Sequence, residues 1–301
     1  MSSLLSILDI KDEVKDILDL ANDFKEGKII EKPLKDKSLA MIFQKSSTRT
    51  RISFEVGMYQ LGGQTLFLSN NDLQMGRGEP IKDTAKVISR YVDGIMIRAI
   101  NHEDVEELAK EATVPVINGL TDLEHPCQAL ADMLTIQQHL GSYEGKLTYI
   151  GDGNNVCNSL ILICACLGMD FTIACPIGYQ PNETIIEKAL KISEETESKI
   201  IITQDLEIAV TDADVIYTDV WVSMGDEEEK EKRKHDFKKY QVNEELIKLS
   251  KEDSIFMHCL PAIRGEEVTS EVIDGTHSVI YDQAENRLHA QKAVMYYLMK
   301  D

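Results

Sequence analysis

Residues 47–51 of the chain, Ser-Thr-Arg-Thr-Arg, place three hydroxyl side chains and two guanidinium groups at the start of an expected helix. They follow an apolar run at 39–43 that is typical of a buried strand, and residues 51–61 have the spacing of an amphipathic helix. Hydroxyl groups cap helix starts, and the first-turn amides attract anions there. Guanidinium groups add paired donors that match phosphate oxygens. A capped helix with two solvated arginines is the alternative, but together these features predict a phosphate-binding site.

Other polar side chains stand where expected strands end. Arg98 closes the strand 94–98, and His125 with Gln128 begins a helical pattern after the strand 114–117. Open parallel sheets bind ligands at the carboxyl ends of their strands. Each residue alone could be a surface arginine or a structural helix-start histidine, but their shared location predicts a site for small polar groups.

Asp219 and Cys259 follow the expected strands 215–218 and 255–258. A nucleophilic cysteine needs a base and an oxyanion site. His258 is the neighbouring base, but successive strand residues point to opposite faces of a sheet, which disfavours a covalent role. We therefore expect Cys259 to be a polar contact within the site.

A Gly-Asp-Gly-Asn-Asn run at 151–155 follows the strand 147–150 and opens a helix, which raises the alternative of a dinucleotide-binding oxidoreductase. That fingerprint needs a third glycine where Val156 stands, and an acidic residue after the next strand, where 171–176 has none. The sequence therefore disfavours a dinucleotide, and the two asparagines offer amide groups suited to an amino-acid-like ligand.

Strand-like and helix-like segments alternate along nearly the whole chain, which is typical of parallel sheets. We predict an α/β fold with two doubly wound parallel-sheet domains joined by interdomain helices. The predicted domains are residues 1–133 and 134–285, with a bridging helix at 126–140 and a C-terminal helix at 286–301 packing back on the first domain. A last strand is expected at 279–281.

The composition argues against several partners. The 301 residues include 52 acidic and 32 basic side chains, for a formal net charge of −20. Nucleic acids and anionic membranes need a basic surface, so neither partner is expected. No apolar run reaches the ~20 residues of a membrane span, and no signal peptide is recognised. The six cysteines contain no CxxC pair, which predicts free thiols in the cytoplasm and no zinc-type site.

The order and spacing of these motifs resemble the aspartate/ornithine carbamoyltransferase family over essentially the whole chain. The Ser-Thr-Arg-Thr-Arg run is shared across the family, whereas His-Pro-Cys-Gln at 125–128 and His-Cys-Leu-Pro at 258–261 resemble its ornithine branch. Ser-Met-Gly at 223–225 is the most specific ornithine feature, and Glu-Asn-Arg at 285–287 is a further match. Gln44 departs from the family, which often has Glu there.

The resemblance implies transfer of the carbamoyl group from carbamoyl phosphate to the side-chain amine of L-ornithine by direct attack of the neutral amine, giving L-citrulline and phosphate. The implied catalytic residues are Arg98, His125, Asp219 and Cys259. Carbamoyl phosphate would be bound, mainly by the first domain, through Ser47, Thr48, Arg49, Thr50, Gln74, Arg98, His125, Gln128, Cys259, Leu260 and Arg287. The second domain would bind L-ornithine through Asn155, Asp219, Ser223 and Met224. No metal or organic cofactor is expected.

The resemblance also implies a homotrimer or a multiple of trimers, in which Gln74 reaches into the neighbouring subunit's site. A sibling enzyme that carbamoylates putrescine is the alternative, but putrescine has no α-carboxylate for the Ser-Met-Gly run to bind. A non-catalytic protein that binds a phosphorylated metabolite would also fit the phosphate site, although it leaves His125, Asp219 and Cys259 without a role.

Overall fold

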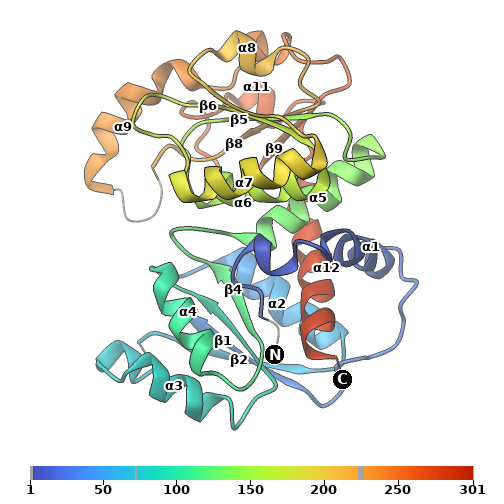
Figure 1. Ribbon diagram of the computed structural model, residues 1–301, viewed down its shortest axis with the longest axis vertical. Coiled ribbons are helices and arrows are strands. Elements are labelled where there is room, and N and C mark those ends of the chain that lie inside the picture. The colour runs from blue at the N-terminus through green and yellow to red at the C-terminus, as the bar shows by residue number, and fades with distance from the viewer. Residues whose placement is uncertain (1–2, 72, 223–226, 301) are drawn as a thin grey trace. The chain divides into compact units, whose positions relative to one another are not determined.

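The chain forms two compact units, and each contains one all-parallel sheet between helices (Figure 1). A computed structural model describes residues 3–71, 73–222 and 227–300. Unit 1 comprises Met1–Leu134 and Glu285–Asp301, and unit 2 comprises Thr135–Ala284. The chain passes between the units within two helices, α5 (Pro126–Leu140) and α12 (Ile280–Met299). The predicted α/β fold with two parallel sheets is confirmed.

Unit 1 has a four-stranded sheet in the order β2-β1-β3-β4. Its strands are β1 (Ser38–Phe43), β2 (Gln64–Ser69), β3 (Gly94–Arg98) and β4 (Val116–Leu120). Its further helices are α1 (Val14–Lys25), α2 (Thr48–Gln60), α3 (Ile81–Ile88) and α4 (His102–Glu111), with 3-10 turns η1 (Ile7–Ile10) and η2 (Met75–Arg77). Every residue of β1 is buried, as expected for an inner strand covered on both faces.

The helices of unit 1 cover the two faces of its sheet. Helices α3 and α4 pack against one face through Ala85, Val105 and Leu108 (Figure 1). Helices α2 and α12 lie side by side, and the absence of a side chain at Gly57 allows the α2 backbone to approach α12 closely. A Cβ atom at this position would lie 3.0 Å from Cε of Met295. The C-terminal helix is thereby held against the helix that begins with the Ser-Thr-Arg-Thr-Arg run.

Unit 2 has a five-stranded parallel sheet in the order β7-β6-β5-β8-β9. Its strands are β5 (Lys146–Ile150), β6 (Asp170–Ala174), β7 (Ile200–Thr203), β8 (Val215–Thr218) and β9 (Ile255–His258). Its further helices are α6 (Asn155–Leu167), α7 (Glu183–Thr196), α8 (Leu206–Val210), α9 (Lys230–Phe237), α10 (Glu244–Ile247) and α11 (Ser270–Ile273), with 3-10 turns η3 (Glu227–Glu229) and η4 (Lys238–Tyr240).

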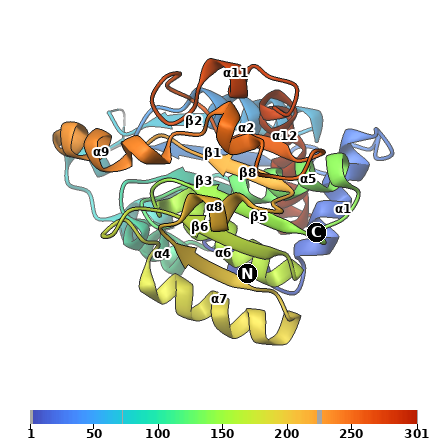
Figure 2. The same cartoon turned by 90° about the horizontal axis from the view of Figure 1, so that it is seen from above.

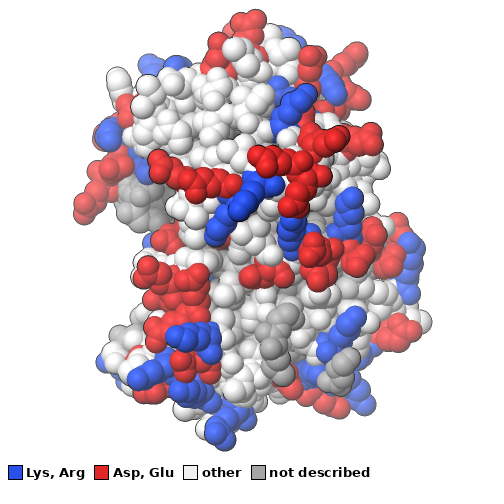
Figure 3. Space-filling view, in the orientation of Figure 1, with Lys and Arg blue, Asp and Glu red and all other residues white. Residues whose placement is uncertain are grey.

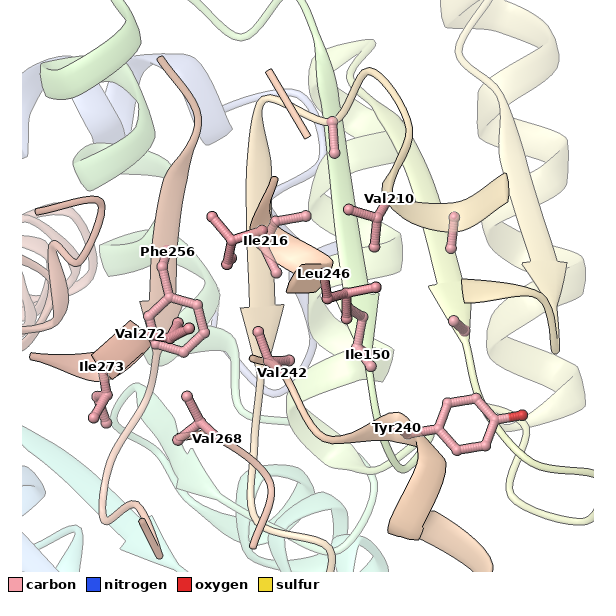
Figure 4. Close-up of a cluster of buried hydrophobic side chains, with 14 of the residues drawn as sticks. Ile150, Val210, Ile216, Tyr240, Val242, Leu246, Phe256, Val268, Val272 and Ile273 are labelled. Carbon is pink, nitrogen blue, oxygen red and sulfur yellow. The ribbon is translucent and has the colours of Figure 1, made fainter. Parts of the chain in front are cut away.

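One face of this sheet carries a large apolar core, in which Ile216 and Phe256 of the strands are buried with Val210, Leu246 and Ile273 of the short helices (Figure 4). Helices α6 and α7 run side by side on the other face (Figures 1 and 2). The sheet is therefore covered on both sides, and its strand ends are left for polar side chains.

The predicted strand at 279–281 is wrong. Ser278 forms an isolated bridge with Phe256, and the Val279 amide donates to the Phe256 carbonyl at 3.0 Å. The Val279 carbonyl already accepts the amide of Gln283 at 2.9 Å, which is a helical bond. Pairing with β9 ends there because the same apolar run begins α12.

The surface reflects the composition. Carboxylate side chains are spread over the face shown in Figure 3, with lysines and arginines between them. In the part of the chain that the structure describes, no helix is both long enough and apolar enough to cross a membrane.

Candidate active site

The start of α2 has the geometry of an anion-binding helix terminus. Ser47 is the N-cap residue, and its side chain accepts a hydrogen bond from the Thr50 amide at 3.4 Å. The helix begins at Thr48, so the main-chain N–H groups of the Ser-Thr-Arg run point out of the N-terminal end of the helix. Arg49 is half-buried beside them.

The two arginines of the run have different surroundings. Nε of Arg51 lies 2.9 Å from a carboxylate oxygen of Glu55, and its guanidinium stacks 3.7 Å from the centre of the Phe67 ring. Arg51 is therefore engaged with Glu55 and Phe67 on the outer surface, whereas Arg49 is half-buried.

Arg98 ends β3 and is only 6% exposed. The register between β3 and β4 shifts between Ile97 and Arg98, an irregularity of the kind that redirects a side chain at a strand end. Gln44 holds the main chain that follows the Arg98 side chain. The main-chain amide of Gln44 donates to the Arg98 carbonyl at 2.9 Å, and its side-chain Oε1 accepts the Ile100 amide at 2.7 Å. The residue that departs from the family pattern thus supports Arg98.

His125 directly precedes α5 and is 5% exposed. Burial lowers the pKa of its imidazole well below the usual value, and the charges of Arg287, Arg98 and Arg49 act in the same direction. The ring is therefore neutral at pH 7, and a neutral imidazole carries one N–H donor.

Three guanidinium groups of unit 1 lie within electrostatic range of one another. The pKa of Arg98 is lowered to about 10, first by burial and then by Arg287 and Arg49. Arg287 is 3% exposed, and its Nη1 and Nη2 donate to Gln128 Oε1 at 2.7 Å and Thr50 Oγ1 at 3.2 Å. We call these three arginines, together with the neutral His125, the cationic cluster. Grouped positive charge of this kind favours a dianionic ligand.

Gln74 is exposed and lies between β2 and α3, where its carbonyl accepts the Arg77 amide at 2.8 Å as η2 begins.

Asp219 and Cys259 meet at the strand ends of unit 2. The Cys259 thiol donates to Asp219 Oδ1 at 3.1 Å, and the Val220 amide donates to the same oxygen at 2.8 Å. Asp219 is 7% exposed, whereas Cys259 is only half-buried. The pair is therefore a thiol hydrogen-bonded to a carboxylate, with the sulfur nearer the surface.

The second Asp219 oxygen is held by Asn154, the asparagine of the 151–155 run that the predicted ornithine contacts leave out. Asn154 Nδ2 donates to Asp219 Oδ2 at 2.9 Å, while its Oδ1 accepts the amides of Val156 and Cys157 at 3.0 and 3.1 Å. Asn155 is the first residue of α6. The preference for Asn at the N-cap position could have distinguished Asn154 from Asn155 in the sequence. The side chain of an N-cap residue turns back to accept the amides of the first helical turn, as Asn154 does here.

The glycines of the 151–155 run have a packing role. A Cβ atom on Gly153 would lie 2.2 Å from the backbone nitrogen of Pro181, so only glycine fits there. Beside it, Asp152 pairs with Arg233 at 2.7 Å, and the same Arg233 nitrogen donates to the Trp221 carbonyl at 3.2 Å. This buried ion pair holds the segment that leads away from Asp219.

His258 is engaged away from Cys259. Its Nδ1 accepts the Leu260 amide at 2.9 Å, so Nε2 carries the proton and faces Glu267 at 3.1 Å. The ligand atoms of Asp219, His258 and Cys259 lie within 4.8 Å of one another, but a metal there would have to displace the Leu260 hydrogen bond. The pairing supports the expectation that Cys259 has no histidine base.

Two further predicted residues need comment. Leu260 has a left-handed φ of 58°, which turns the chain sharply after β9. Ser223 and Met224 lie outside the described residues.

Comparisons with known proteins identify the family. The carbamoyl-P binding domain of aspartate/ornithine carbamoyltransferases matches residues 2–138, and the Asp/Orn binding domain of the same family matches residues 144–298. Ornithine carbamoyltransferase from Methanobrevibacter smithii is 68% identical over 301 residues, which is 100% of both chains. The enzyme from Methanothermobacter thermautotrophicus is 65% identical over the same full length of both chains.

Solved structures show the same architecture. Ornithine carbamoyltransferase from Pyrococcus furiosus matches with a TM-score of 0.95 at 54% identity, covering 99% of this chain and 96% of that one. The anabolic ornithine carbamoyltransferase from Campylobacter jejuni matches with a TM-score of 0.95 at 43% identity, covering 99% of each chain.

The two arginines of the run provide a matched test of the cationic cluster. Arg49→Ala should weaken binding of inorganic phosphate, measured by calorimetry, by about tenfold to a hundredfold, since a hydrogen bond to a charged group contributes about 1.5–3 kcal/mol. Arg51→Ala should change it less than about twofold, because Arg51 pairs with Glu55. An equal loss of phosphate affinity in Arg49→Ala and Arg51→Ala would contradict the assignment of Arg49 to the cationic cluster.

Proposed function

The chain belongs to the aspartate/ornithine carbamoyltransferase family, and we propose that it transfers the carbamoyl group of carbamoyl phosphate to the side-chain amine of L-ornithine, giving L-citrulline and phosphate. The observation that carries the proposal is the cationic cluster of unit 1, which combines three guanidinium groups with a neutral imidazole. This combination suits a substrate with a dianionic phosphate beside an uncharged carbonyl group.

The phosphate end of the substrate is held by residues at the start of α2 and the end of β3. They are Ser47, Thr48, Arg49, Thr50 and Arg98. Helix amides and guanidinium groups stabilise the phosphate both in the substrate and as the departing group. Gln74 completes the set from the neighbouring subunit.

The carbamoyl end is oriented by hydrogen-bond donors and acceptors, of which only Arg287 is charged. His125 donates to the carbamoyl oxygen, where negative charge grows as the tetrahedral intermediate forms. Because its imidazole stays neutral, it adds no further cation to the cluster. The remaining carbamoyl contacts are Gln128, Arg287, Cys259 and the Leu260 carbonyl.

The reaction is direct attack by the amine. The neutral side-chain amine of ornithine forms a bond to the carbamoyl carbon, the bond from that carbon to the phosphate oxygen breaks, and phosphate leaves with the electron pair. The ornithine side chain must first lose a proton to become the neutral amine, and Asp219 with its hydrogen-bonded partner Cys259 governs that deprotonation. The proton that the attacking nitrogen releases as the new bond forms leaves with the phosphate. Asn155, Ser223 and Met224 hold the α-amino and α-carboxylate groups with Asp219.

The two parts of the chain divide the substrates. Residues 1–133, with the helix 286–301, bind carbamoyl phosphate, and residues 134–285 bind ornithine. The match of one carbamoyl-P domain and one Asp/Orn domain in that order supports this division. Neither a metal nor an organic cofactor takes part.

We also propose that the enzyme is a homotrimer or a multiple of trimers. Five large apolar side chains of α2 and β2 are exposed in the single chain: Ile52, Val56, Tyr59, Leu66 and Phe67. An exposed apolar face of this kind is typical of an interface between copies. Sedimentation equilibrium should therefore find a multiple of three chains, and a monomer would contradict this assembly.

The enzyme acts in the cytoplasm, in arginine biosynthesis. Its six cysteines are free thiols, and Cys127, Cys157, Cys164 and Cys175 are buried, which suits a reducing compartment. The acidic surface gives it no affinity for nucleic acid.

The acceptor amine tests the function directly. With carbamoyl phosphate as donor, L-ornithine should exceed putrescine in kcat/KM by about 10⁴-fold, because putrescine lacks the α-carboxylate and leaves the hydrogen-bonding partners of that group unpaired. L-aspartate should also be a far poorer acceptor than L-ornithine, because it has no side-chain amine. Release of phosphate, the product common to all three reactions, is the measurement. If putrescine matched ornithine, the alternative of a putrescine-type enzyme would replace this proposal.

The thiol has a testable role of its own. Cys259→Ser should retain part of the turnover, since a hydroxyl group can still donate to Asp219. It should also shift the pH dependence of kcat, because a hydroxyl group is far less acidic than a thiol. A carbamoyl-enzyme adduct seen by mass spectrometry, with nearly complete loss in the Ser variant, would instead establish a covalent mechanism.

A further inference from the structure

The side-chain amide of Gln128 lies between a carboxylate and a guanidinium group. Gln128 Nε2 donates to Asp132 Oδ1 at 2.8 Å, and Arg287 Nη1 donates to Gln128 Oε1 at 2.7 Å. These side chains are all buried, with exposed fractions of 0% for Asp132, 2% for Gln128 and 3% for Arg287. Asp132 stands four residues after Gln128 and so occupies the same face of α5.

This arrangement allows one amide orientation only. A carboxylate can accept but not donate, and a guanidinium can donate but not accept. If the Gln128 amide turned over, its NH₂ group would face Arg287 and its oxygen would face Asp132. Both contacts would then be unfavourable, so Oε1 must face the cationic cluster.

Arg287 cannot move to relieve such a reversal, because other residues hold it. Its Nη2 donates to Thr50 at 3.2 Å. With the Gln291 amide oriented so that its oxygen faces Arg287, that oxygen accepts from Nη2 at 2.9 Å and from Nε at 3.2 Å, and the amide nitrogen donates to Ser53. Residues of α2, α5 and α12 therefore fix the guanidinium plane against which Gln128 is set.

We propose that Asp132 is a positioning residue that makes Gln128 selective for a carbamoyl group. The inference rests on the proposed function. Gln128 Oε1 has two lone pairs, one of which accepts from Arg287, and the second accepts an N–H of the carbamoyl NH₂ group. An acyl phosphate with a methyl group in that place, such as acetyl phosphate, offers no donor to the second lone pair of that oxygen. Asp132 thus acts on substrate choice through Gln128, without touching the substrate.

The test compares ligands that share the phosphate group and differ in the carbamoyl end. The KM for carbamoyl phosphate and the inhibition constants of acetyl phosphate and inorganic phosphate are measured with saturating L-ornithine. Asp132→Ala should raise the KM about tenfold, the loss expected when a buried polar group loses its partner. The two inhibition constants should change less than about twofold, because the phosphate contacts are untouched. Asp132→Asn, which keeps an acceptor oxygen, should restore most of the wild-type KM.

Two results would overturn the inference. A parallel weakening of all three ligands in Asp132→Ala would mean that Asp132 only supports the fold of unit 1. An unchanged KM would mean that Gln128 does not depend on it. In a Gln128→Ala background Asp132→Ala should have no further effect on the KM, since coupled residues are not additive.

The experiment remains decisive if Asp132→Ala does not fold. Gln128→Met alone should remove the preference for carbamoyl phosphate over acetyl phosphate, and an unchanged preference would contradict the inference. Failure of the proposed function itself is distinct, because the wild-type protein would then form no citrulline before any variant is examined.

Discussion

The burial of like charges in unit 1 is the constraint on which the site depends. Arg98 and Arg287 are almost fully covered, and burial, followed by the charges of Arg287 and Arg49, lowers the pKa of Arg98 to about 10. Such an arrangement is unfavourable in the empty protein and becomes favourable when a dianion is bound. The capped start of α2, the register shift at the end of β3 and the close packing of α12 on Gly57 all serve to hold these groups together.

The same charges determine the state of His125. Burial and the three arginines keep its imidazole neutral, so in the proposed reaction it can donate to the carbamoyl oxygen without competing with the arginines for the phosphate. In unit 2 the arrangement is different. Asp219 receives donors from Asn154, Val220 and Cys259, which leaves a thiol next to a carboxylate where a proton must be removed. Binding of the anion and handling of the proton are thus assigned to separate parts of the chain.

The sequence predicted those features that depend on local pattern. The alternating strands and helices, the helix start at Ser47 and the strand-end position of Arg98 follow from periodicity and capping preferences. It failed where two local readings compete. Residues 279–281 are apolar enough for a strand, but Ile280 begins α12. Contacts between distant segments were not accessible at all. Nothing in the sequence around Arg287 indicates that its guanidinium lies beside Gln128 and Thr50, which are 159 and 237 residues away along the chain.

The central claim is that unit 1 accepts electrostatic strain in order to bind a dianion, and urea unfolding of Arg98→Met with and without inorganic phosphate tests it most directly. Replacing a buried charge by an apolar side chain of similar length should make the ligand-free protein more stable by about 1 kcal/mol or more. Phosphate should then stabilise the wild-type protein but not the variant. A variant that is less stable than the wild type without phosphate, and that phosphate still stabilises to the same extent, would contradict the account.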